Sequence, residues 1–250
     1  MGALGSGPCL PVLAWDTELA AGLEGPRREQ ATRLSMTAAR EVRTGPWAPE
    51  RLVGAAGPAL AEGYGLLVLE GMAARTVDCD GRTAAELLGP GDLLQPQQCG
   101  RPHETIDVGV HWTVLADLRI ALLDRSFAMR LAPYPEVSVA LASRAMQRAR
   151  DLAVRLSIAQ FSRVDDRLTL LLWHLAERWG KVHADGVLVR LPLTHEMLSQ
   201  LIAVRRPSVT VGLGELRRRG EIVPVAGGWL LRGEPTAGIG SGSVRMLAAS

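Results

Sequence analysis

Arginines gather near the C-terminal end of the chain. From Arg190 to Arg232 there are seven arginines and three acidic residues, a net charge of +4, whereas the whole chain carries +2. Because Lys181 is the sole lysine, arginine is common throughout, and the placement of the arginines is more informative than their number. A basic end on an otherwise balanced chain is typical of a segment that contacts phosphate groups.

Two short helices joined by a tight turn are expected to position these arginines, over residues 194–201 and 206–219. Thr194 precedes the first helix and can cap it with its hydroxyl group. Pro207 fits the first turn of the second helix, where a missing N–H costs nothing. Ala203, in the turn, is small enough for two helices to cross closely.

The second helix has an apolar stripe formed by Val209, Leu213 and Leu216, at spacings of four and three. At about 100° per residue, the side away from this stripe is the one that would enter the major groove of DNA. The residues on that side are Arg206, Pro207, Thr210, Val211 and Gly214. Gly212 and Gly214 each cost a helix about 1 kcal/mol relative to alanine, which predicts a helix that is soft until DNA orders it.

The elements around this pair complete a winged helix-turn-helix over residues 163–232. An amphipathic helix over 164–179 and a strand over 188–191 precede it. A hairpin with strands near 222–225 and 229–231 follows. The tail, residues 233–250, is rich in glycine and serine and is expected to be disordered.

Upstream, residues 61–134 read as a β domain of many short strands. Asp80-Gly81 and Pro90-Gly91-Asp92 are turn sequences between short apolar runs. Such a pattern suggests a barrel or sandwich. Residues 1–60 are poorly defined and are expected to contribute to the same domain, with a possible helix within 17–43. The overall fold class is therefore α+β.

A long helix without glycine or proline is expected from Glu136 to about Phe161, so residues 135–162 are assigned to dimerisation. Its apolar stripe is too long to hide against a small domain, and a second copy of the chain would cover it. The residues assigned to the dimer interface are Val137, Leu141, Ala145, Leu152 and Leu156. The alternative is a helix packed within its own chain.

These motifs resemble those of the Crp/Fnr family of bacterial regulators. The matching residues in the C-terminal part are Leu193-Thr194, Arg206-Pro207-Ser208-Val209-Thr210, Leu213, Leu216 and Gly220-Glu221-Ile222. Leu87-Leu88-Gly89-Pro90-Gly91-Asp92 resembles a turn of the family's cyclic-nucleotide-binding-like β-roll, which is jelly-roll-like. The passage from Ile120 to Asp124 into a long helix is also similar, so the resemblance covers residues 60 to 232.

The resemblance implies a homodimer that reads a palindromic operator in double-stranded DNA, with RNA polymerase as a candidate partner. It implies that Arg206 reads guanine, and that Ser208 and Thr210 contact phosphates or bases. Pro207 and Val211 depart from better-known members, because neither can hydrogen-bond a base edge. We therefore expect the target DNA sequence to differ from that of the better-known members. The complete set assigned to DNA binding is Thr194, His195, Arg205, Arg206, Pro207, Ser208, Thr210, Val211, Arg217 and Arg218.

No cofactor or effector is predicted, although a signal at the β-roll is expected to tune DNA binding. The stretch after Asp92 lacks the glycine-glutamate and arginine-serine pairs with which nucleotide-binding members hold a phosphate. Cys9, Cys79 and Cys99 are too few and too far apart for an iron–sulfur cluster or a zinc site. A haem would need His103 or His111 as a ligand, and a lone histidine is weak support for one.

Two other classes of function compete with a regulator. The chain has none of the common motifs of hydrolases, nucleotide-binding enzymes or zinc proteases, so an enzyme is not expected. A dimeric interaction protein that has lost specific DNA binding stays open, because Pro207 and Val211 weaken base readout. The chain also lacks a secretory signal and an apolar run of about 18 residues, which predicts a cytoplasmic protein without a membrane anchor.

Overall fold

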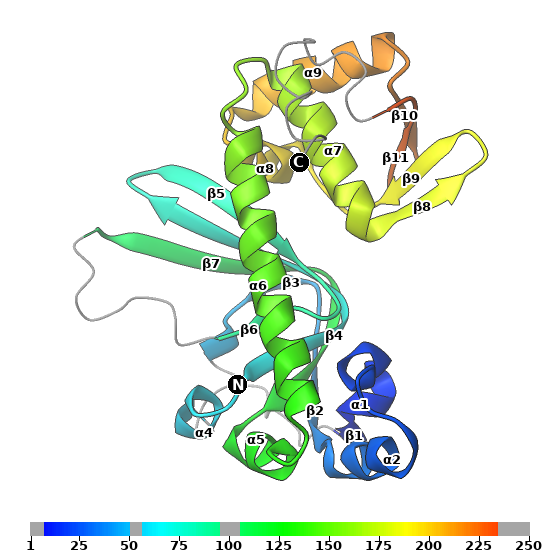
Figure 1. The fold of residues 1–250 in the computed structure, drawn as a ribbon. Coiled ribbons are helices and arrows are strands. Elements are labelled where there is room, and N and C mark those ends of the chain that lie inside the picture. The colour runs from blue at the N-terminus through cyan, green and yellow to red at the C-terminus, as the bar shows by residue number, and fades with distance from the viewer. Residues whose placement is uncertain (1–7, 51–56, 96–105, 235–250) are drawn as a thin grey trace, which may run out of the picture. The chain divides into compact units, whose positions relative to one another are not determined.

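The computed structural model describes residues 8–50, 57–95 and 106–234, which fall into two compact units (Figure 1). The boundary between the units lies at Asp151–Leu152. Unit 1 is an antiparallel β domain with covering helices, and unit 2 is a small domain of helices and a sheet. The predicted α+β fold class is confirmed.

The sheet of unit 1 has seven antiparallel strands within the described residues. Five follow the order β1-β2-β7-β4-β5, while β3 pairs with β7 and β6 pairs with β4. The strands are β1 (Cys9–Pro11), β2 (Met36–Val42), β3 (Gly45–Trp47), β4 (Gly65–Cys79), β5 (Arg82–Leu88), β6 (Leu93–Leu94) and β7 (Val108–Leu123).

Two long strands, β4 and β7, form the centre of this sheet where we expected pairs of short strands. Their register shifts between Val68 and Ala73, which marks bulges that bend the strands. Gly71 lies in this stretch with φ +87°, and a Cβ there would come within 2.1 Å of the Asp117 carbonyl oxygen. Gly71 therefore marks a bend within β4.

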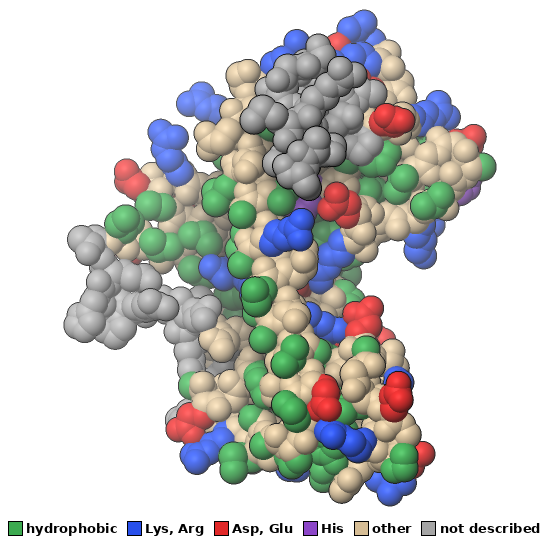
Figure 2. Space-filling view, viewed as in Figure 1, with side chains coloured by type: hydrophobic (Ala, Val, Ile, Leu, Met, Phe, Trp, Pro, Cys, Tyr) green, Lys and Arg blue, Asp and Glu red, His purple; other side chains and the backbone are tan. Residues whose placement is uncertain are grey.

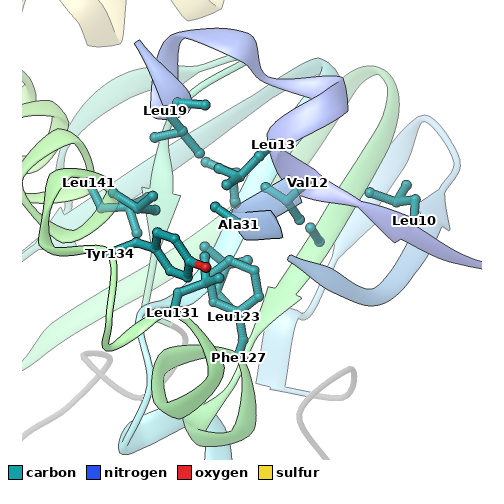
Figure 3. Close-up of a cluster of buried hydrophobic side chains, with 14 of the residues drawn as sticks. Leu10, Val12, Leu13, Leu19, Ala31, Leu123, Phe127, Leu131, Tyr134 and Leu141 are labelled. Carbon is teal, nitrogen blue, oxygen red and sulfur yellow. The ribbon is translucent and has the colours of Figure 1, made fainter. Parts of the chain in front are cut away.

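Short helices pack against the sheet and enclose an apolar core (Figure 3). They are α1 (Val12–Trp15), a 3-10 helix over Thr17–Ala20, α2 (Gly25–Leu34) and α5 (Arg125–Leu131), whereas Leu60 of α4 (Gly57–Ala61) belongs to a second core with Leu66 and Val68. Leu13, Leu19, Phe127 and Leu131 meet in this core and are almost fully buried. The helix expected within residues 17–43 is confirmed as α2, which ends at Leu34 because β2 takes up 36–42 by pairing with β1 and β7.

Two local hydrogen bonds lie beside this core. The Asp124 carboxylate accepts a hydrogen bond of 2.8 Å from the Phe127 amide and caps α5. The predicted Pro90-Gly91-Asp92 turn is confirmed. Gly91 has φ +91°, and the buried Asp92 carboxylate accepts a hydrogen bond of 2.8 Å from the Gly89 amide.

The long helix α6 (Pro135–Ile158) packs one side against unit 1. Val137 and Leu141 are each 1% exposed within the core of Figure 3, so they cannot line a dimer interface as we expected. On the same side, Arg144 pairs with Asp16. One helical turn on, Arg148 donates a 2.7 Å hydrogen bond to the Leu93 carbonyl oxygen.

Unit 2 contains α7 (Val164–Trp179), α8 (His195–Leu201), α9 (Arg206–Arg218) and an antiparallel sheet of order β10-β11-β9-β8. The strands are β8 (Gly180–His183), β9 (Gly186–Arg190), β10 (Ile222–Val225) and β11 (Gly228–Leu231). The hairpin β10–β11 and helix α7 are as predicted, whereas β8 was not foreseen. Among the described helices, none combines the length and the apolar character that a bilayer crossing requires.

Candidate DNA-binding site

The helix pair α8–α9 is held by the local interactions that the sequence suggested, with one correction. The Thr194 hydroxyl accepts a 3.1 Å hydrogen bond from the Met197 amide, and Pro207 lies in the first turn of α9. Ala203 does not mediate a close helix crossing. It is exposed in the turn and has φ +53°, a left-handed conformation that costs a residue with a side chain roughly 1 kcal/mol.

Helix α9 packs against unit 2 through the predicted apolar stripe. Val209 and Leu216 are fully buried and Leu213 is 8% exposed. The opposite side is open to solvent, in agreement with the helical periodicity. The predicted outward residues, all exposed, are Arg206, Pro207, Thr210, Val211 and Gly214.

The two glycines of α9 have different surroundings, which the sequence did not distinguish. Gly212 is buried, and a Cβ on it would lie 2.6 Å from Leu168 Cδ1 and 3.3 Å from Val164 Cγ1 of α7. A Cβ on Gly214 would meet nothing within 4 Å. Gly212 therefore allows α9 to approach α7 closely, while only Gly214 lowers the stability of α9 without a packing benefit.

Ion pairs join the first turn of α7 to the last turns of α9. Asp165 is 8% exposed and pairs with Arg163 at 2.7 Å and with Arg219 at 3.2 Å. Glu215 pairs with Arg218 at 2.6 Å. The Arg163 hydrogen bond holds the pKa of the Asp165 carboxyl below its usual range, and the Arg218 hydrogen bond does the same to the pKa of Glu215.

This network divides the cations of α9 into two groups. The guanidinium groups of Arg218 and Arg219 are engaged by carboxylates. The side chains of Arg205, Arg206 and Arg217 are exposed and make no ion pair or hydrogen bond with any residue that the structure describes. These three guanidinium groups are free to meet phosphates or base edges, and they lie at the two ends of α9.

The remaining residues assigned to DNA binding lie at the start of α8 and in the first half of α9. His195, the first residue of α8, makes a 2.9 Å hydrogen bond through Nδ1 to the Thr210 hydroxyl of α9. Pro207, Ser208 and Val211 line an open groove between α9 and the start of α7.

Arg163 lines this same groove, and our sequence analysis did not assign it to the site. Its side chain is 65% exposed. The available signal was its position immediately before the first turn of α7.

In unit 1, four side chains form a row across the strands β3, β7, β4 and β5. Trp47 lies opposite Trp112, Trp112 opposite Arg75, and Arg75 opposite Glu86. Arg148 of α6 adds a second cation, with 2.6 Å between its guanidinium group and the Glu86 carboxylate. The buried atoms Trp47 Nε1, Trp112 Nε1 and Arg75 Nε have no hydrogen-bond partner among the described residues.

Two of the residues considered for cofactors, Cys99 and His103, fall outside the described residues. His111 is exposed on β7, and Cys9 and Cys79 are exposed free thiols. Within the described part of the chain, His, Cys, Asp and Glu side chains form no cluster of three that could hold a metal ion.

Comparison with known proteins identifies the C-terminal segment. Residues 166–232 match the Crp-like helix-turn-helix domain. The chain is 31% identical over 140 residues to the regulatory protein CysR of Synechococcus elongatus, covering 54% of this chain and 59% of that protein. It is 28% identical over 146 residues to a CRP-like cAMP-activated global transcriptional regulator of Mycobacterium tuberculosis, covering 57% of this chain and 63% of that protein. The chain thus spans about three fifths of these relatives.

Solved structures share the fold over a larger part of the chain. A cyclic nucleotide-binding domain containing protein from Listeria monocytogenes has a TM-score of 0.61 at 13% identity, covering 87% of this chain and 97% of that one. A CooA mutant from Carboxydothermus hydrogenoformans has a TM-score of 0.56 at 18% identity, covering 69% and 75%. The fold comparison therefore includes the β domain as well as the helix-turn-helix.

The contrast between Gly212 and Gly214 predicts opposite effects of alanine. Gly214→Ala should raise the free energy of unfolding of unit 2 by about 1 kcal/mol through helix propensity. Gly212→Ala should lower it by about 1 kcal/mol, because the added methyl group displaces Leu168 and separates α9 from α7. Urea unfolding followed by circular dichroism measures both changes. An equal gain in the two variants would show that Gly212 has no packing role.

Proposed function

We propose that the chain is a transcription regulator of the Crp/Fnr type, which binds a palindromic operator as a homodimer. The observation that carries the proposal is the exposed side of α9, which presents Arg206 and Arg217, two arginines that make no ion pair with any residue that the structure describes. Figure 2 shows blue side chains over this part of unit 2.

The geometry of the helix pair supports insertion of α9 into the major groove. Arg206 lies at the first residue of α9, the end that contacts base edges in a helix-turn-helix. Its guanidinium group suits the O6 and N7 atoms of guanine. Pro207 and Val211, which is 73% exposed, offer only apolar contacts, such as one with a thymine methyl group. DNA binding also implies action in the cytoplasm, with RNA polymerase as the candidate partner.

Selection of bound fragments from genomic DNA with the purified protein tests this proposal. We expect a palindrome with half-sites about one helical turn apart, bound with an affinity that falls steeply with salt. Arg206→Ala should abolish the sequence preference. If that preference survives, Arg206 does not read the operator. Binding that lacks both salt dependence and preference would instead favour a dimeric interaction protein.

Two matched variants test whether the exposed Arg217, and not the ion-paired Arg218, contacts a DNA phosphate. Arg217→Ala should weaken binding to every sequence alike and reduce the slope of log affinity against log salt by about 1. Arg218→Ala should change that slope little, because Glu215 already pairs with Arg218. Equal effects of the two substitutions would contradict the distinction between the exposed Arg217 and the ion-paired Arg218.

A second copy of the chain is the partner that we propose for the outer side of α6. Six exposed residues recur there at alternating spacings of three and four, the seven-residue repeat of a two-stranded seam. They are Val139, Ala142, Met146, Ala149, Ala153 and Leu156. Figure 2 shows hydrophobic side chains along α6. Of the residues first assigned to the interface, Ala145, Leu152 and Leu156 are exposed and border or join this row.

A charge in the middle of this row should dissociate the dimer. Met146 is 74% exposed, and Met146→Glu would place a carboxylate in the proposed apolar seam. Sedimentation equilibrium should then give the monomer mass. Gln147→Glu, on the adjoining side of α6, is the matched control and should stay dimeric. A wild-type protein that is monomeric at micromolar concentration would refute the dimer.

A signal acting on unit 1 is the last part of the proposed function. A buried N–H group without an acceptor costs roughly 1–3 kcal/mol. The three such donors in the row, on Trp47, Trp112 and Arg75, therefore need acceptors from water or from a small molecule. Arg75, Arg148 and Glu86 together carry a positive charge, which favours an anion. We therefore propose a small anionic effector at this row.

Tryptophan fluorescence tests for such an effector. Titration with sodium phosphate, sulfate and acetate should change the emission of the wild-type protein for at least one anion. Trp112→Phe should remove the response, whereas Trp229→Phe in unit 2 should keep it. If no anion acts, or if both variants respond alike, water satisfies these donors and the signal acts elsewhere.

A further inference from the structure

The hydrogen bond between His195 and Thr210 joins the two helices of the helix-turn-helix on their exposed side. The distance from Nδ1 to the Thr210 hydroxyl oxygen is 2.9 Å. His195 is half-buried, and Thr210 is exposed. Both residues were assigned separately to DNA binding, but in the structure they form one unit.

The Thr210 hydroxyl group has a single proton and two acceptors within reach. One is His195 Nδ1 at 2.9 Å, and the other is the Arg206 carbonyl oxygen, one turn earlier in α9, at 3.5 Å. A separation of 3.5 Å is at the outer limit of a hydrogen bond. A hydroxyl proton directed at the imidazole ring makes the shorter of these two hydrogen bonds, and it requires that Nδ1 be the acceptor.

This arrangement fixes the tautomer of a neutral His195. If Nδ1 accepts from Thr210, the ring proton must reside on Nε2. The second nitrogen then presents an N–H donor, which matches a phosphate oxygen. The reverse arrangement, with the hydroxyl directed at Arg206, would leave Nε2 as an acceptor that a phosphate oxygen repels.

We infer that Thr210 does not read a base but positions His195, whose Nε2–H donates to a DNA phosphate. This inference rests on the proposed function. A phosphate is the expected acceptor because His195 begins the first helix of the pair, which crosses the DNA backbone while the second helix occupies the groove. Thr210 is thus a positioning residue, and its hydroxyl group is already committed within the protein.

Nitrogen NMR of the imidazole tests the tautomer without DNA. In full-length protein labelled with ¹⁵N-histidine, at about pH 8 where imidazole is ordinarily neutral, the His195 signals should show protonated Nε2 and unprotonated Nδ1. His195→Gln identifies these signals. Thr210→Ser should preserve the tautomer, and Thr210→Val should produce a mixture. A wild-type ring protonated on Nδ1 overturns the inference.

A double-mutant cycle tests the role in binding on the selected operator fragment. Thr210→Val should weaken binding about fivefold, the effect of roughly one hydrogen bond, and Thr210→Ser should stay near wild type. In a His195→Ala background, Thr210→Val should have no further effect. Additive losses with an altered sequence preference would mean that Thr210 reads DNA itself and would overturn the inference.

The two measurements distinguish the inference from the proposed function. A wild-type protein that binds no duplex at low salt would end both the regulator proposal and the phosphate contact. A protein that binds its operator normally but has the other tautomer, or an additive cycle, would leave the regulator intact and remove only the role given to His195 and Thr210. Circular dichroism should show equal helix content in all variants.

Discussion

The close packing of α9 on α7 is the constraint on which the DNA-binding surface depends. Gly212 lets Val164 and Leu168 come against the backbone of α9, which fixes the rotation of the helix about its own axis. That rotation decides which residues are buried and which face solvent. Arg206 and Thr210 are outward because Val209 and Leu216 are inward. The ion pairs of Asp165 then hold the neighbouring ends of the two helices together.

The features that the sequence predicted well are those with local causes. The Thr194 cap, the position of Pro207 and the stripe of α9 depend on spacings within one or two helical turns, and the structure agrees with each. The span of α7 follows equally from its periodicity. The overall fold class followed from the change in periodicity between the two parts of the chain, and the comparisons agree with it.

The misjudged features depend on residues that are distant in the sequence. The bends of β4 and the strand β2 arise from pairing with β7, which lies far along the chain. Val137 and Leu141 were assigned to a partner because an apolar stripe does not reveal whether its own chain or another copy covers it. Ala203 was misread because its small side chain does not reveal the positive φ that it adopts in the turn.

Helix α6 has one side packed on unit 1 and another in the proposed dimer seam, which restricts where insertions and deletions can occur in this protein. Val137, Leu141, Arg144 and Arg148 contact unit 1 from one side, and the proposed seam occupies a side rotated well away from it. One inserted residue would turn everything after it by about 100°. An insertion near Ser143 would thus move either the arginines off Asp16 and Glu86 or the seam off its partner. Insertions and deletions should be tolerated in the loops of unit 1, whereas α6 can accept substitutions only.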